Sequence, residues 1–137
     1  MAESTPTATV PSGDPLPTGH ATLRAVAMPS DTNPNGDIFG GWLLSQMDLA
    51  GGIAAYERAG GRVATVAVDA LSFHEPVSVG DIVSCYARVD RVGRTSIRVA
   101  IETYVRRRDG GHTEKVTEGT FVYVAMDTNG RPRAVDP

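Results

Sequence analysis

Apolar and polar residues alternate through most of the second half of the chain. In the stretch 96–107, Ile97, Val99 and Ile101 occupy every second position, a period that is typical of a half-buried β-strand. Gly-containing turns separate this run from similar runs before and after it, and such turns favour hairpins. We therefore expect an antiparallel sheet with strands over 20–28, 63–73, 82–92, 96–107 and 116–126.

Residues 41–58 follow a different pattern and predict a helix, which Gly60 and Gly61 then end. Apolar and small side chains lie on almost every side of this helix, as is typical of a buried one. A flat sheet cannot cover it, so the sheet must bend around the helix and a second copy must cover what remains. The sequence therefore predicts an α+β hotdog fold, a bent antiparallel sheet wrapped around one long buried helix.

Length and composition fit a single domain. The chain has 137 residues, 41% of them hydrophobic, and no internal repeat. Residues 1–19 are rich in Pro, Ser and Thr and predict a flexible tail before a domain over 20–137. No apolar run is long enough to span a membrane, and no leader pattern is present. The single Cys85 lies in an apolar alternation, so we expect a packed thiol and a cytoplasmic location.

The net charge, the arginine clusters and the spacing of the histidines indicate which classes of ligand the protein could bind. The net charge of −3 argues against general nucleic-acid binding, which depends on phosphate contacts. Arginines nevertheless gather over 88–98 and 106–108, either as solvated faces or as contacts for a small polyphosphate ligand. The three histidines, His20, His74 and His112, have no metal-ligand spacing, so no metal site is expected.

The segment NPNGDIFGGWLLSQMD, residues 33–48, carries the strongest functional pattern. Gly40 and Gly41 place bare backbone N–H groups at a helix start, where the helix dipole attracts negative charge. Asp48 is a carboxylate within an otherwise apolar run, and such a group needs a partner, a proton or a catalytic role. One interpretation is a helix cap followed by a solvent-facing Asp. We favour the other, an oxyanion site with a nearby general base.

Several stretches resemble the bacterial hotdog-fold acyl-CoA thioester hydrolases of the YciA type. They are AMPSDTNPNGDIFGGWLLSQMDLAGGIAA, TVAVDALSFHEPVSVGDIV and VGRTSI, and the similarity runs from about residue 22 to residue 135. The resemblance implies hydrolysis of acyl-CoA to a fatty acid and coenzyme A, without a cofactor, by a homodimer that assembles as a trimer of dimers. It implies that Asp48 is the general base or nucleophile, that the Gly40 and Gly41 backbone polarises the thioester carbonyl, and that Asn33 positions water or substrate.

The resemblance also points to residues for the nucleotide end of coenzyme A. Arg94, with Thr95 and Ser96, matches the family's region for that end, and Arg91 is a weaker candidate. Two departures stand out. Many relatives have His at the position of Phe39, and some have Ser or Thr where 66–68 reads Val-Ala-Val, which leaves Thr65 or Ser72 as substitutes.

The spacing within the helix predicts a site shared between subunits. Seven residues separate Gly41 from Asp48, or ~10 Å along a helix axis. Reacting atoms must approach to ~3–3.5 Å, so we expect Asp48 of one subunit to work with Gly40 and Asn33 of another. An acyl-thioester dehydratase, or a non-catalytic acyl-CoA-binding protein, remains an alternative. Trp42, Leu43 and Met47 are candidates either for an acyl channel or for the core.

Overall fold

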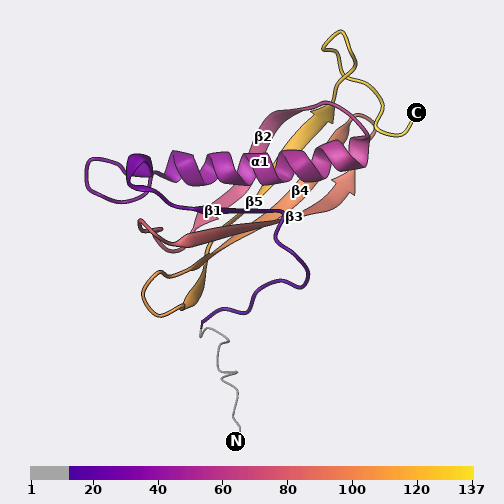
Figure 1. The fold of residues 1–137 in the computed structure, drawn as a ribbon. Coiled ribbons are helices and arrows are strands. Elements are labelled where there is room, and N and C mark those ends of the chain that lie inside the picture. Colours follow the sequence, from indigo (N-terminus) through magenta and orange to yellow (C-terminus); the bar gives the residue numbers. More distant parts are fainter. Residues whose placement is uncertain (1–12) are drawn as a thin grey trace, which may run out of the picture.

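A five-stranded antiparallel sheet forms most of the structure, a computed structural model that describes residues 13–137 (Figure 1). Its strand order is β1-β3-β4-β5-β2, and every neighbouring pair is antiparallel. All five predicted strands are present, although the first is shorter than expected because only four of its residues pair with β3. The strands are β1 (Leu23–Val26), β2 (Val63–Phe73), β3 (Ile82–Val92), β4 (Ser96–Arg106) and β5 (Thr113–Ala125).

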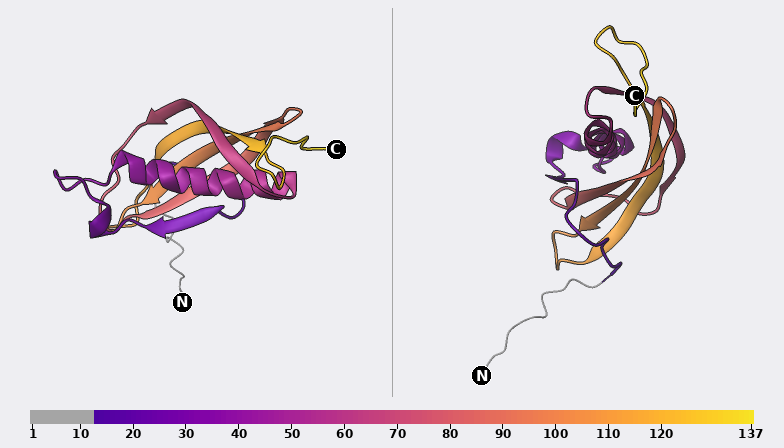
Figure 2. Two further views of the ribbon diagram at one scale, coloured as in Figure 1. Left: turned by 90° about the horizontal axis from the view of Figure 1, so that it is seen from above. Right: turned by 90° about the vertical axis from the view of Figure 1, so that its right-hand side faces the viewer.

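The helix α1 (Gly40–Ala59) crosses the concave side of the sheet (Figure 2). It follows a single 3-10 turn, η2 (Pro29–Asp31), and ends at Gly60, whose φ of 69° suits a residue without a side chain. Leu43, Met47 and Ala50 are buried against the sheet and form part of the core. The predicted α+β architecture, with a bent sheet around one long helix, is confirmed.

One chain covers only one side of α1. Viewed along the helix, the sheet bends around one side of α1 and leaves the other side open (Figure 2). Leu49 and Tyr56 are each 57% exposed on this open side, and Ile53 is 41% exposed. The apolar pattern all around the helix therefore does not reflect complete burial within one chain. The sequence also predicted that a second copy covers the open side of the helix, and this stays a prediction.

β2 is an edge strand with an irregular path. Its register with β5 shifts after Thr65 and again after Asp69, and Ala70 has a positive φ of 51°. Val66 is 57% exposed and Phe73 is 52% exposed, although such residues are usually covered in a sheet. Within the described part of the chain, β2 pairs only with β5, so one of its edges keeps unpaired backbone groups.

The expected N-terminal tail is described only in part. Residues 1–12 lie outside the described residues, whereas Gly13 and Asp14 lie against β5. The Asp14 N–H donates to the Thr113 carbonyl at 3.0 Å, and the Lys115 N–H donates to the Asp14 carboxylate at 2.8 Å. The boundary between tail and domain at residue 20 stays a prediction.

Among the described helices, none has the length and apolar character to cross a bilayer.

Candidate active site

Asn33 folds the loop that leads into α1. Its side-chain Oδ1 accepts hydrogen bonds from the N–H groups of Asn35 at 2.9 Å and Asp37 at 3.1 Å. Its own N–H donates to the Asp37 carbonyl at 2.7 Å. The side-chain oxygen is therefore occupied by the loop. The side-chain NH₂ group donates to no residue within 13–137, and so it is the part of Asn33 that is available to a ligand.

The start of α1 presents two free donors. The N–H groups of Trp42 and Leu43 both donate to the Phe39 carbonyl, whereas those of Gly40 and Gly41 donate to no described residue. Both glycines are exposed, and a Cβ added at Gly41 would meet nothing within 4 Å. The structure thus brings together the two predicted oxyanion donors in an accessible place at the positive end of the helix dipole.

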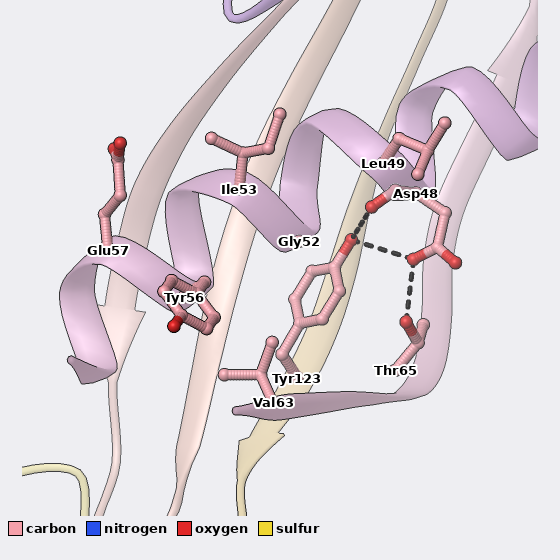
Figure 3. Close-up of a pocket in the computed structure, with 9 residues that line it drawn as sticks. All are labelled: Asp48, Leu49, Gly52, Ile53, Tyr56, Glu57, Val63, Thr65 and Tyr123. Atoms are coloured by element: carbon pink, nitrogen blue, oxygen red, sulfur yellow. Dashed lines mark hydrogen bonds between the residues drawn. The ribbon is translucent and has the colours of Figure 1, made fainter. Parts of the chain in front are cut away.

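Asp48 is held by two hydroxyl groups that come from different strands (Figure 3). Its Oδ1 accepts from Thr65 Oγ1 at 2.7 Å and from the Tyr123 hydroxyl, which lies 3.0 Å away. The same hydroxyl also lies 3.0 Å from the Asp48 backbone carbonyl. Asp48 Oδ2 has no partner among the described residues, so this oxygen is free for chemistry. Of the two expected substitutes, Thr65 contacts Asp48 and Ser72 does not.

Tyr123 is the residue that sequence reasoning missed. Burial, and then the neighbouring Asp48 carboxylate, raises the pKa of the Tyr123 hydroxyl, so it remains a hydrogen-bond donor. Its approach depends on Gly51, because a Cβ at that position would overlap the hydroxyl. The Gly51-Gly52 pair was the available sign, since glycine inside a helix costs about 1 kcal/mol relative to alanine and so indicates a close approach.

An open groove runs from Asp48 along the uncovered side of α1. Its volume is about 490 Å³. Glu57 lies toward the C-terminal end of the helix, and mostly apolar side chains line the groove between the two carboxylates (Figure 3). Leu43 and Met47 are buried in the core instead, and the partly buried Trp42 packs against that core, so the single chain favours the core alternative for these three. The residues lining the groove are Asp48, Leu49, Gly52, Ile53, Tyr56, Glu57, Val63, Thr65 and Tyr123.

The predicted nucleotide-binding residues lie elsewhere in the chain. Arg94, Thr95 and Ser96 belong to the turn between β3 and β4 and to the start of β4, and Arg91 is at the end of β3. The Arg94 carbonyl accepts from Val135 N–H, and the next residue, Asp136, pairs with Arg58 in the last turn of α1. Both arginines are exposed, and none of the four residues lines the groove. Asn33 and Gly40 lie at the other end of α1, so one chain does not bring the predicted site residues together.

Cys85 is a packed thiol, as expected. It is fully buried in β3, and burial raises the pKa of its thiol to about 11. Thr103 Oγ1 donates to its Sγ at 3.5 Å. Across residues 13–137, no three His, Cys, Asp or Glu side chains gather in a way that could hold a metal ion.

Comparisons with known proteins place this chain among thioesterases. Residues 35–111 match the model of the thioesterase superfamily. The acyl-CoA thioester hydrolase YciA of Salmonella typhimurium is 53% identical over 123 residues, which cover 88% of this chain and 92% of that protein. The solved structure of the hexameric thioesterase y2039 from Yersinia pestis is 54% identical, with a TM-score of 0.82, over 87% of this chain and 97% of that chain.

A more distant solved structure carries ligands and variants. The acyl-CoA hydrolase of Staphylococcus aureus, in complex with butyryl coenzyme A, coenzyme A and coenzyme A disulfide, is 28% identical with a TM-score of 0.75. The similarity covers 82% of this chain and 68% of that chain. Alanine variants of that hydrolase have been solved at an aspartate, at an asparagine fifteen positions before it, and at a threonine seventeen positions after it.

Proposed function

Because this chain belongs to the thioesterase superfamily and is an acyl-CoA thioester hydrolase with the hotdog fold, we propose that Asp48 is its general base or nucleophile. The observation that carries the proposal is the free Oδ2 of Asp48 at one end of an apolar groove. Acyl-CoA is hydrolysed there to a free fatty acid and coenzyme A.

The arrangement around Asp48 suits attack on a thioester. Thr65 and Tyr123 hold Oδ1, so Oδ2 either takes a proton from the attacking water or attacks the carbonyl carbon itself. In the first case, the new C–O bond comes from water, the C–S bond breaks, and coenzyme A leaves as a thiolate that then takes up a proton. In the second case, Oδ2 forms the new C–O bond, the C–S bond breaks, and coenzyme A leaves as a thiolate that takes up a proton. Water then cleaves the acyl anhydride on Asp48, which releases the fatty acid and restores the carboxylate.

The N–H groups of Gly40 and Gly41 are the proposed donors to the oxyanion. Neither has an acceptor within the described chain, and both lie at the N-terminal end of α1, the positive end of its helix dipole. Loss of a single oxyanion donor typically raises a barrier by ~2.7–4 kcal/mol, so these two groups supply a substantial part of the catalysis. The Asn33 side-chain NH₂ lies in the loop just before them and positions water or substrate.

We place the complete site between two subunits. Gly40 and Asp48 lie on one straight helix, two turns apart, so one chain cannot present both to the same carbonyl carbon. The open side of α1 and the exposed apolar residues of β2 supply the surface that a second copy would cover. Homodimers follow, and the hexameric state of the Yersinia pestis relative supports a trimer of such dimers.

The spacing of the Staphylococcus aureus variants supports the choice of residues. Asn33 precedes Asp48 by fifteen residues and Thr65 follows it by seventeen, the same separations as between the three varied positions of that hydrolase. The asparagine, aspartate and threonine therefore recur as a set with the same order and spacing.

The direct test is release of coenzyme A from a panel of acyl-CoAs, followed with a disulfide reagent that reports free thiols. We expect release that increases linearly with enzyme concentration and a chain-length preference set by the apolar groove. The only thiol of the protein is the buried Cys85, so the folded enzyme should give no background of its own. A dehydratase would change the acyl chain without releasing thiol, and a binding protein would do neither.

Arg94 is proposed to contact a phosphate of coenzyme A, and Arg94→Ala should raise KM by a modest factor with little change in kcat. Its side chain is exposed, and a contact made equally in ground and transition states affects binding alone. The effect should shrink at high salt, which screens exposed charges. It should vanish for truncated thioesters that lack the nucleotide. An unchanged KM for acyl-CoA would remove Arg94 from the site.

A further inference from the structure

The loop between β2 and β3 supports the start of α1. The Ile38 N–H donates to the Val77 carbonyl at 3.3 Å, and both side chains are buried. A second connection joins the same loop to Ala27, which accepts from Gly80 N–H at 2.8 Å and donates to the Asp81 carbonyl at 3.0 Å. Ile38 precedes Gly40 by two residues. The position of the Val77 carbonyl therefore helps to set where the helix and its free N–H groups begin.

An ion pair between the buried Asp81 and the partly buried Arg107 fixes the peptide units on both sides of Val77. Asp81 is only 2% exposed, and its Oδ2 accepts from Arg107 Nη1 at 2.6 Å and from the Ser78 N–H at 2.9 Å. Arg107 Nη1 also donates to the Pro76 carbonyl at 2.8 Å. Since Pro76 and Ser78 are the neighbours of Val77 in the chain, the Arg107–Asp81 pair holds Val77 from both directions.

Glu114 completes the environment of Arg107. Its Oε2 accepts from Arg107 Nε at 2.6 Å, so three different acceptors bind one guanidinium group. A planar guanidinium meets such a set with its donors fixed in direction, whereas a lysine ammonium at the end of a flexible chain does not. Of the three consecutive arginines at 106–108, Arg107 is the one whose side chain is engaged in this way.

We propose that Arg107 is a positioning residue for thioester hydrolysis, acting through Val77 and Ile38 on the N–H groups of Gly40 and Gly41. The inference rests on the proposed function, because it assumes that these glycines bind the oxyanion. Oxyanion donors work only at the correct distance from the developing charge, and a misplacement of about 1 Å can cost about 10²-fold in rate. Arg107 itself touches neither substrate nor reacting atoms.

The test compares Arg107→Lys with Arg106→Lys, the same substitution one position earlier. Arg106 is exposed, and its side chain has no ion pair or hydrogen bond within the described residues. We expect Arg107→Lys to lower kcat by about tenfold or more while KM changes by less than about twofold, and Arg106→Lys to change neither. The loss should be equal for acyl-CoA and for a truncated thioester, since both form the same oxyanion.

Hydrogen exchange followed by mass spectrometry gives a readout that does not depend on turnover. In Arg107→Lys, peptides covering residues 33–43 should exchange faster, while the rest of α1 keeps its protection. A melting temperature that falls with unchanged kcat and unchanged exchange over 33–43 would assign Arg107 a purely structural role and overturn the inference. If Arg107→Lys does not fold, Asp81→Asn disrupts the same pair with nearly the same shape and is measured in the same way.

Asp48→Asn, measured alongside, distinguishes a failure of the proposed function from a failure of the proposed role of Arg107. If Asp48→Asn keeps its rate, the proposed function fails, whatever Arg107→Lys does. If Asp48→Asn is inactive and Arg107→Lys matches Arg106→Lys in kcat, the proposed function stands and only the role of Arg107 is overturned.

Discussion

Asp48→Asn is expected to lose nearly all turnover while the protein keeps its fold. The asparagine retains a side-chain oxygen that accepts from Thr65 and Tyr123, so the hydrogen bonds between α1 and the sheet persist. It has no negative charge with which to take a proton from water or to attack a carbonyl. General bases contribute about 10²–10⁴-fold, and we expect kcat to fall by a factor in that range.

The measurement is coenzyme A release at saturating acyl-CoA, with a thermal melt to confirm that the variant is folded. Asp109→Asn is the matched control, because it makes the same chemical change at an exposed turn between β4 and β5. A variant at Asp48 that keeps more than about a tenth of the rate, a barrier change under ~1.4 kcal/mol, would show that Asp48 is not the base.

Mixing two inactive proteins should restore activity if each site is built from two chains. Asp48→Asn lacks the carboxylate, and Asn33→Ala lacks the side chain that folds the loop before the oxyanion donors. A heterodimer of these variants contains one site with both defects and one site with neither. With random exchange at equal amounts, about a quarter of all sites are intact, so about a quarter of the wild-type activity should return.

Subunit exchange has to be shown separately, for example by energy transfer between labelled chains. Asp48→Asn mixed with Asp48→Ala is the control, because both defects fall in the same half of the site and no intact site can form. Demonstrated exchange without any recovery by the Asp48→Asn and Asn33→Ala pair would mean that each site lies within one chain.

Local patterns in the sequence were sufficient to predict the helix and the strands of the fold. The alternation of Ile97, Val99 and Ile101 gave the strand β4, and Gly60 gave the end of α1, because both features depend on residues close together in the chain. The two-residue period of a strand and the left-handed glycine at a helix end are properties of the backbone itself. They therefore show in one sequence without knowledge of the tertiary contacts.

Contacts between distant parts of the chain could not be predicted from local patterns in the sequence. Tyr123 reaches Asp48 across 75 residues, and its place in the alternation of β5 looks like an ordinary core position. Arg107 pairs with Asp81 across 26 residues, and within the run 106–108 nothing distinguishes it from its neighbours. Such pairs depend on the order of strands in the sheet, which local periodicity does not specify.

The continuity of α1 has a mechanical consequence. In the proposed dimer, each helix gives its carboxylate to one site and its N-terminal donors to the other, so the first two turns of α1, a rigid rod of about 12 Å, join the two reaction centres. A substrate that draws the first turn of the rod toward its carbonyl also displaces the carboxylate two turns away. The two sites are then coupled mechanically, because a substrate bound at one site changes the geometry of the other.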